Sequence, residues 1–127
     1  MKNGVNLSDG EWKLMKLLWE QPRTVAELVQ ACADDTGWKK NTLFVMLGRL
    51  ERKGAVRCED GTVKRFYPAV TREDCEALQT RGFLERVYDG SVGMMVSAMV
   101  SRQALSKQDI DELRKILERA EMTQEHA

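Results

Sequence analysis

The chain has 127 residues, of which 43% are hydrophobic and 31% charged, the ordinary composition of a globular protein rather than a disordered or fibrous one. This length suits one compact domain or two small ones. No apolar run approaches the ~20 residues of a membrane span, and the N-terminal residues lack the apolar centre of a signal peptide. The sequence therefore predicts a cytoplasmic protein without membrane insertion.

The formal net charge is zero, but the charges are unevenly distributed. Residues 1–37 carry four basic and six acidic side chains, residues 38–70 carry eight and three, and residues 71–127 carry eight and eleven. A block of net charge +5 thus lies between two acidic blocks. Such a patch indicates a nucleic-acid-binding surface, although the solvated face of a helix would look the same.

The first seventy residues carry signals for three helices. Ser8 and Thr24 are each followed three residues later by a glutamate, the spacing of a capping box at a helix start. Pro22 ends the first of these helices and Gly37 the second. A third helix is predicted from about residue 40 to residue 53, where Gly54 ends it.

The third helix has two different faces. Stepping 100° per residue, Leu43, Met46, Leu47 and Leu50 fall on one side, which predicts the face toward the core. The opposite side carries Asn41, Val45, Gly48, Arg49 and Arg52, with Thr42 beside them.

A hairpin follows this helix. Apolar and charged residues alternate on both sides of Asp60-Gly61, a strong turn signal, up to Pro68. Three helices followed by a basic two-stranded hairpin predict a winged helix-turn-helix, a mainly α fold with a small β-hairpin wing. The third helix then occupies the recognition position, and Lys64 and Arg65 lie on the wing.

The remainder of the chain is predicted to be helical, with helix starts at Thr71, Ser91 and Ser106. We therefore expect a DNA-binding domain at 1–70 and a three-helix dimerisation domain at 71–127. Three short helices bury little core alone, so their apolar faces favour a symmetric homodimer; the alternative is a core within one chain. The candidate dimer interface is Leu84, Tyr88, Met94, Met95, Val96, Met99, Val100, Ile110, Leu113, Ile116 and Leu117.

The outward face of the third helix suits the major groove of DNA, whose width admits one helix. Asn41 can pair with adenine, Thr42 can reach a base or a phosphate, and Val45 suits a thymine methyl group. The cations are expected on phosphates, which position the protein without reading sequence. The candidate DNA-binding residues are Lys39, Lys40, Asn41, Thr42, Val45, Arg49, Arg52, Lys53, Lys64 and Arg65.

Several of these residues have a structural alternative. Arg49 and Arg52 could be solvated or paired with carboxylates, Val45 could pack under the wing, and Asn41 could cap the helix. Phe44 is expected at the edge of the domain and Trp38 in the core.

The sequence offers no catalytic, metal-binding or cofactor-binding constellation. The three cysteines share no close spacing and fit reduced structural thiols. A redox role for Cys58, on the hairpin, is a weaker alternative. The protein is therefore not expected to be an enzyme.

Four stretches resemble successive blocks of the BlaI/MecI penicillinase-repressor family: LSDGEWKLMKLLW, WKKNTLFVMLGRLERKGAV, FLERVYDGSVGMMV and ALSKQDIDELRKIL. The resemblance covers about residues 7 to 118. It implies a homodimeric bacterial repressor that binds palindromic operator DNA and controls β-lactam resistance or related stress genes. It also implies induction by a membrane sensor protease system that cleaves the repressor in the tail.

Two positions depart from the family pattern. The aligned cleavage bond is Ala98-Met99 instead of Asn-Phe, and Lys39-Lys40-Asn41-Thr42 replaces Ser-Pro-Lys-Thr at the start of the recognition helix. The alternative function is a small-molecule- or metal-responsive regulator of the same fold without proteolytic induction. The clustered C-terminal cysteines of the copper-responsive branch do not occur here. A third candidate is a winged helix that serves only protein–protein contact.

Overall fold

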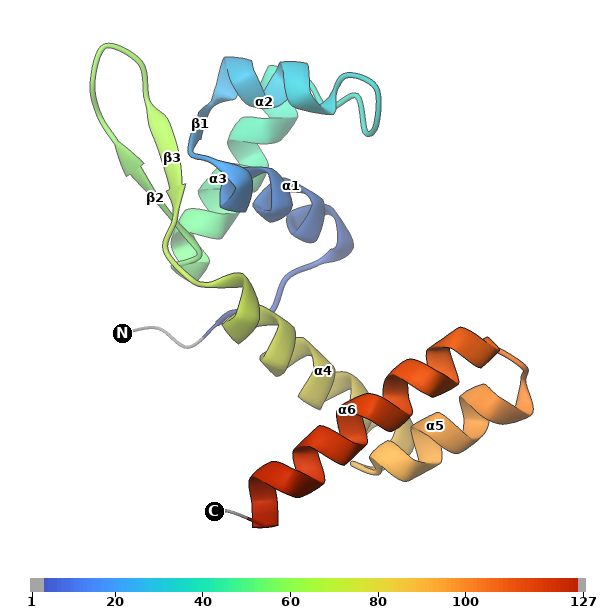
Figure 1. Ribbon diagram of the computed structural model, residues 1–127. Coiled ribbons are helices and arrows are strands. Elements are labelled where there is room, and N and C mark those ends of the chain that lie inside the picture. The colour runs from blue at the N-terminus through green and yellow to red at the C-terminus, as the bar shows by residue number, and fades with distance from the viewer. Residues whose placement is uncertain (1–3, 126–127) are drawn as a thin grey trace. The chain divides into compact units, whose positions relative to one another are not determined.

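The computed structural model describes residues 4–125 and is mainly helical, with one small antiparallel sheet (Figure 1). The predicted fold class, a winged helix-turn-helix followed by helices, is confirmed. The chain separates into two compact units, called unit 1 up to Gly82 and unit 2 from Phe83 onward. The elements are α1 (Asp9–Glu20), β1 (Arg23–Thr24), α2 (Val25–Cys32), α3 (Lys40–Lys53), β2 (Val56–Glu59), β3 (Arg65–Pro68), α4 (Arg72–Tyr88), α5 (Val92–Ser101) and α6 (Lys107–Glu125).

Both predicted capping boxes are present, at the starts of α1 and α2. The Ser8 hydroxyl accepts from the Glu11 N–H at 3.2 Å, and the Ser8 N–H donates to Glu11 Oε1 at 2.8 Å. Thr24 and Glu27 form the same pair of bonds at the same distances. These bonds satisfy backbone donors that a helix start leaves open. At the other end, Gly54 closes α3 with a φ of 80°, a conformation that glycine adopts without steric cost.

Unit 1 has a closed hydrophobic core to which its three helices and the sheet contribute. Cys75, in the first turn of α4, is buried in the same core, and the Trp12 indole donates to Gln79 Oε1 at 3.2 Å. The first turns of α4 are therefore part of unit 1. The large side chains that are fully buried include Leu14, Met15, Leu18, Leu28, Leu43, Leu47 and Leu50.

The sheet has three strands in the order β1-β3-β2, all antiparallel. The sequence predicted only the β2–β3 hairpin, in which Cys58 pairs with Phe66 and residues 60–64 form the wing loop. The additional strand β1 pairs Arg23 with Phe66 and Thr24 with Arg65. Two residues are too few to show the alternation by which strands are detected, and Thr24 also caps α2.

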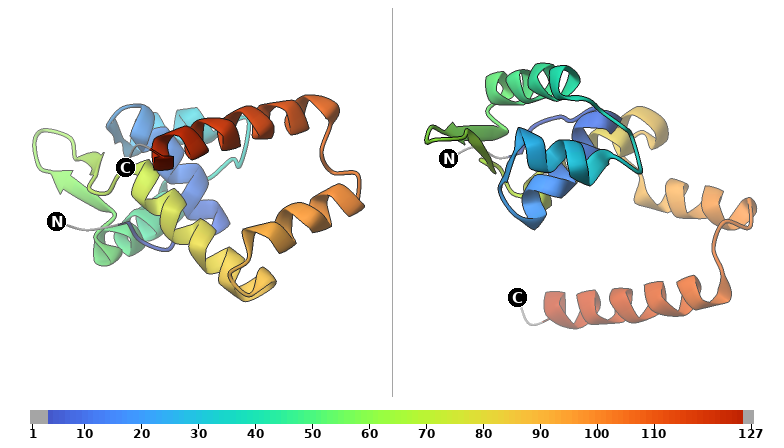
Figure 2. Two further views of the ribbon diagram at one scale, coloured as in Figure 1. Left: turned by 60° about the horizontal axis from the view of Figure 1, so that its bottom comes forward. Right: turned by 90° about the horizontal axis from the view of Figure 1, so that it is seen from above.

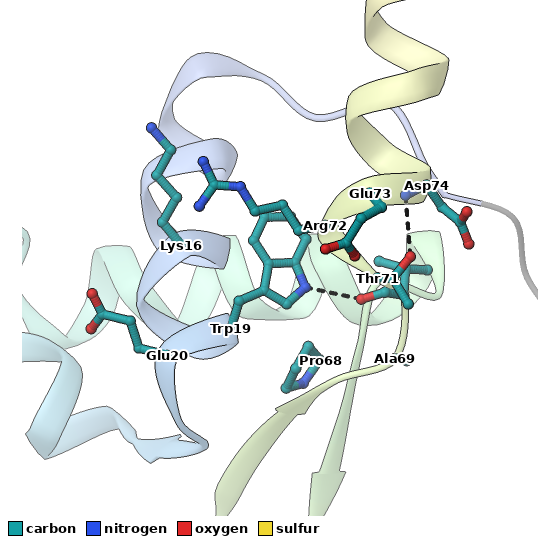
Figure 3. A pocket seen from close by; sticks show the side chains of 10 residues that line it. Lys16, Trp19, Glu20, Pro68, Ala69, Thr71, Arg72, Glu73 and Asp74 are labelled. Atoms are coloured by element: carbon teal, nitrogen blue, oxygen red, sulfur yellow. Dashed lines mark hydrogen bonds between the residues drawn. The ribbon is translucent and has the colours of Figure 1, made fainter. Parts of the chain in front are cut away.

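Trp19 links α1 to the segment that joins the sheet to α4 (Figure 3). Its indole N–H donates to the Val70 carbonyl at 2.9 Å, and the Thr71 hydroxyl accepts from the Asp74 N–H at 3.1 Å. A hollow of about 650 Å³ lies beside this junction, and side chains of both charges line it. It lies at the opposite end of the β2–β3 ribbon from the wing loop.

Unit 2 contains the end of α4 together with α5 and α6. The turn after α4 is left-handed at Asp89 and Gly90, with φ of 51° and 82°. The Ser91 hydroxyl accepts from the Met94 N–H at 3.1 Å at the start of α5, and the Ser106 hydroxyl caps α6. No side chain at 83–124 is fully buried, so unit 2 has well-defined helices without a closed core. None of the described helices is both long enough and apolar enough to cross a membrane.

Candidate nucleic-acid interface

The leucines of α3 decide which face of this helix is free. Leu43, Leu47 and Leu50 are at most 1% exposed and anchor α3 to the core of unit 1. Because these three residues lie on one side of the helix, the opposite side faces away from the core. Figure 2 shows α3 along one edge of unit 1.

The predicted base-contacting residues all lie on the free face. Asn41 and Thr42 are exposed, and Val45 is 60% exposed, so this valine does not pack under the wing. Asn41 does not cap the helix either, because the N-cap residue is Lys39, which makes no side-chain cap bond. At Gly48, a Cβ atom would lie 3.6 Å from Arg52 Nη1. The arginine side chain thus lies over the glycine.

Most of the predicted phosphate contacts are exposed cations without a carboxylate partner among the described residues. Lys39, Lys40, Arg49, Arg52 and Lys64 are exposed. None of these five forms an ion pair with another residue of the range 4–125. These side chains follow the length of α3 and extend to the wing loop, as a surface that tracks a phosphate backbone requires.

Two of the predicted cations are instead held by carboxylates. Lys53 Nζ lies 2.6 Å from Glu11 Oε1 and 3.0 Å from the Asn6 carbonyl oxygen. Arg65 Nη1 lies 3.1 Å from Glu27 Oε1. These pairs connect the end of α3 to α1 and the wing to α2. They position the interface, and sequence reasoning missed them because the partners lie far apart in the chain.

The carboxylates of these pairs are stabilised in their ionised form. Burial acts to raise the pKa of Glu11, but hydrogen bonds from Lys53 and Ser8 outweigh it and the pKa is lowered. The pKa of Glu27 is lowered, chiefly by its bond to the Thr24 N–H. Glu11 is 1% exposed, and its Oε2 has no hydrogen-bond partner in the described part of the chain. Lys53 is therefore the charge that compensates a buried carboxylate.

The cysteines and the two aromatic residues beside α3 occupy ordinary structural positions. Cys32 and Cys75 are buried and Cys58 is half-buried, all as free thiols. Burial, followed by the nearby Asp60 carboxylate, raises the pKa of Cys58, which disfavours the reactive thiolate. Trp38 packs against the core, while Phe44 is 44% exposed. The described residues contain no group of three potential metal ligands.

The predicted dimer residues lie on all three helices of unit 2. A groove of about 560 Å³ between α5 and α6 brings together Val96, Val100, Ile110, Leu113 and Leu117, and adds Val92 and Leu105 to the predicted set. The other predicted residues do not line it: Leu84, Tyr88, Met94, Met95, Met99 and Ile116.

The bond that aligns with the family cleavage point, Ala98-Met99, lies in the second half of α5. Ala98 and Met99 are both half-buried there.

Residues 7–119 match the penicillinase repressor family. The chain belongs to this family. A penicillinase repressor of Bacillus licheniformis is 31% identical over 120 residues, which span 93% of this chain and 94% of that protein. The methicillin resistance regulatory protein MecI of Staphylococcus aureus is 27% identical over 113 residues, 87% of this chain and 92% of the relative.

A solved structure extends the match to the fold of unit 1. The solution structure of the DNA-binding domain of the repressor BlaI superposes with a TM-score of 0.51 at 29% identity, over 58% of this chain and 93% of that one. The family resemblance inferred from the sequence is thereby confirmed. As a member of the penicillinase repressor family, the protein is a DNA-binding transcriptional repressor and not an enzyme.

Proposed function

We propose that this protein is a homodimeric repressor that places one copy of α3 in each half-site of a palindromic operator. The free face of α3 carries this proposal, because it combines polar side chains, an exposed valine and unpaired cations on a rigid helix. In the major groove, Asn41, Thr42 and Val45 lie where base edges are read. Lys39, Lys40, Arg49, Arg52 and Lys64 serve the phosphates, while Lys53 and Arg65 also hold α3 and the wing in place.

The exposed apolar side chains of unit 2 support the proposed dimer. Its apolar residues are half-covered or exposed, with Val92 at 57%, Val100 at 53% and Leu117 at 62%. A second copy of the same surface would cover them, and a two-fold axis would make the contact self-complementary. The two α3 helices would then be fixed at one spacing.

We infer that the regulated genes include antibiotic-resistance genes, since one relative is named a penicillinase repressor and another a methicillin resistance regulator.

In the simplest scheme of induction, a membrane sensor protease system triggers cleavage at Ala98-Met99. Cleavage there would cut α5, which contributes to the proposed dimer surface, and the two chains would separate. The Ala98-Met99 bond lies within a helix, however, and proteases prefer exposed loops to helices. This placement favours a second candidate, a small-molecule- or metal-responsive regulator that is induced without proteolysis. Chains recovered from β-lactam-treated cells distinguish the two: fragments ending at Ala98 support cleavage, and full-length chains during derepression support the second.

Selection of genomic DNA fragments with the purified protein tests the proposed function. We expect a two-fold symmetric sequence whose half-sites lie about 10 base pairs apart or a multiple of that. No enrichment, or an asymmetric site, would contradict the proposal.

The role of α3 is tested on the selected site by Arg49→Ala. This variant should bind more weakly and should lower the slope of log affinity against log salt by about one. Lys13→Ala is the control, because Lys13 is an exposed cation of α1 that pairs with Asp35. An unchanged slope in Arg49→Ala would remove this residue from the interface.

A further inference from the structure

A hollow of about 300 Å³ lies in unit 1 between α2, the start of α3 and the wing loop. Val29 and Phe44 contribute apolar surface from the two helices, and Val63 does so from the wing loop. Lys40 and Lys64 also line the hollow, and no carboxylate does. The site therefore combines an apolar wall with two positive charges.

The residues around this hollow differ from those of its neighbour. An adjacent hollow of about 270 Å³ shares Phe44 and Lys64 but extends toward β2, where Glu51 and Asp60 line it. An anionic ligand is therefore favoured on the α2 side of Phe44 and disfavoured on the β2 side.

The apolar residues are unusually accessible for their size. Phe44 is 44% exposed and Val63, at the wing, is 62% exposed. The Lys40 ammonium lies 5.8 Å from the centroid of the Phe44 ring, within the range of a cation–π contact. An apolar surface with cations beside it matches one repeating ligand of a DNA-binding protein, the sugar–phosphate backbone.

We propose that this hollow is a binding site for the backbone of the DNA strand that passes between α3 and the wing. Phe44 and Val63 contact a deoxyribose, and Lys40 and Lys64 contact phosphates on either side of it. The inference rests on the proposed function, because a helix in the major groove with a wing beside it leaves one strand between them. It assigns Phe44 and Val63 to affinity for any duplex, whereas Val45 serves sequence selectivity.

The test compares the full-length protein with Val63→Ala on two duplexes of about 30 base pairs, the selected operator and one of mixed sequence. We expect affinity for both duplexes to fall by the same factor, about fourfold for each methyl group that the sugar covers. The salt dependence should not change. Val63 lies in the wing loop outside the core, so the variant should fold normally, as circular dichroism would verify.

Two further variants complete the experiment. Phe44→Leu should also weaken binding to both duplexes by the same factor. Lys64→Met should lower the slope of log affinity against log salt by about one on both duplexes. Val45→Ala is the matched control, since it removes the same two methyl groups from the neighbouring exposed surface and should affect the operator alone.

The possible outcomes separate the inference from the proposed function. Unchanged binding by Val63→Ala and Phe44→Leu, or a loss confined to the operator, overturns the backbone site. If Arg49→Ala still weakens binding in that case, the proposed function stands. A wild-type protein that binds neither duplex would contradict both.

Discussion

Unit 1 and unit 2 are both built from capped helices, but they differ in what these helices bury. In unit 1 the apolar stripes of α1, α2 and α3 face one another and the sheet, and many side chains are fully buried. In unit 2 the stripes of α5 and α6 line an open groove, and no side chain at 83–124 is fully buried. Caps and apolar periodicity are local signals that suffice to form helices. Stability additionally requires a partner surface, which unit 1 contains and unit 2 lacks within one chain.

The largest expected effect is the loss of the dimer in Leu113→Asp. This change places a charge in the apolar groove of unit 2, where an unpaired charge is costly to bury. Sedimentation should show a single chain at micromolar concentration. Because two linked half-sites bind with avidity, affinity for the operator should fall about a hundredfold or more.

The matched control is Gln108→Asp, which adds the same charge on a different side of α6. It should keep the mass and the operator affinity of the wild type. A wild-type mass for Leu113→Asp would mean that the α5–α6 groove is not the covered surface.

A change in the core of unit 1 should behave differently. Leu47→Ala removes a side chain that is 1% exposed and should lower the free energy of unfolding by about 2–5 kcal/mol. All three tryptophans lie in unit 1, so their fluorescence during urea unfolding reports on this unit alone. The midpoint should not depend on protein concentration. A midpoint that rises with concentration would show that unit 1 also depends on dimerisation.

The ion pair between the buried Glu11 carboxylate and Lys53 gives unit 1 a pH dependence. The folded pKa of Glu11 is lowered from 4.5, so its stabilising contribution is present at neutral pH and is lost as pH falls below about 4.5, through the folded pKa. Glu11→Gln should lower the free energy of unfolding at neutral pH by about 1–2 kcal/mol. This difference from the wild type should shrink as the solution is acidified.

Urea unfolding followed by tryptophan fluorescence at several pH values would measure this difference. Glu51→Gln is the control, at an exposed glutamate of α3 that forms no ion pair with another residue of the range 4–125, and it should differ little from the wild type. An effect of Glu11→Gln that does not vary with pH would indicate lost packing rather than lost charge.

The smallest expected effect concerns selectivity. Val45→Ala should cost on the order of 1 kcal/mol at a single base pair of each half-site, with an unchanged salt slope. Binding to operator variants that replace one thymine at a time would identify that base pair. Equal losses on all variants would show that Val45 does not read sequence.

The sequence was sufficient to predict most of unit 1 because the decisive signals are local. The serine and threonine caps, Gly54 and the leucines of α3 each act within a few residues, and each is found where predicted. The pairs formed by Lys53 and Arg65 were not predicted, since their partners lie 42 and 38 residues away in the chain. Charge alone cannot tell a phosphate-binding lysine from one that neutralises a buried carboxylate.

The limits differ in unit 2. Apolar periodicity identified Val96, Ile110 and Leu113, which line the groove, but it could not separate them from Met94 and Met99, which do not. Which apolar helix face becomes buried depends on the surface that packs against it. The sequence pattern of one chain does not reveal how two chains pack together.

The central claim is that two chains, joined through unit 2, present two copies of α3 to one operator. The most direct test is the mass of the complex between the full-length protein and the selected operator duplex, measured by native mass spectrometry. The account predicts two chains on each duplex. One chain on each duplex, at saturating protein, would contradict it.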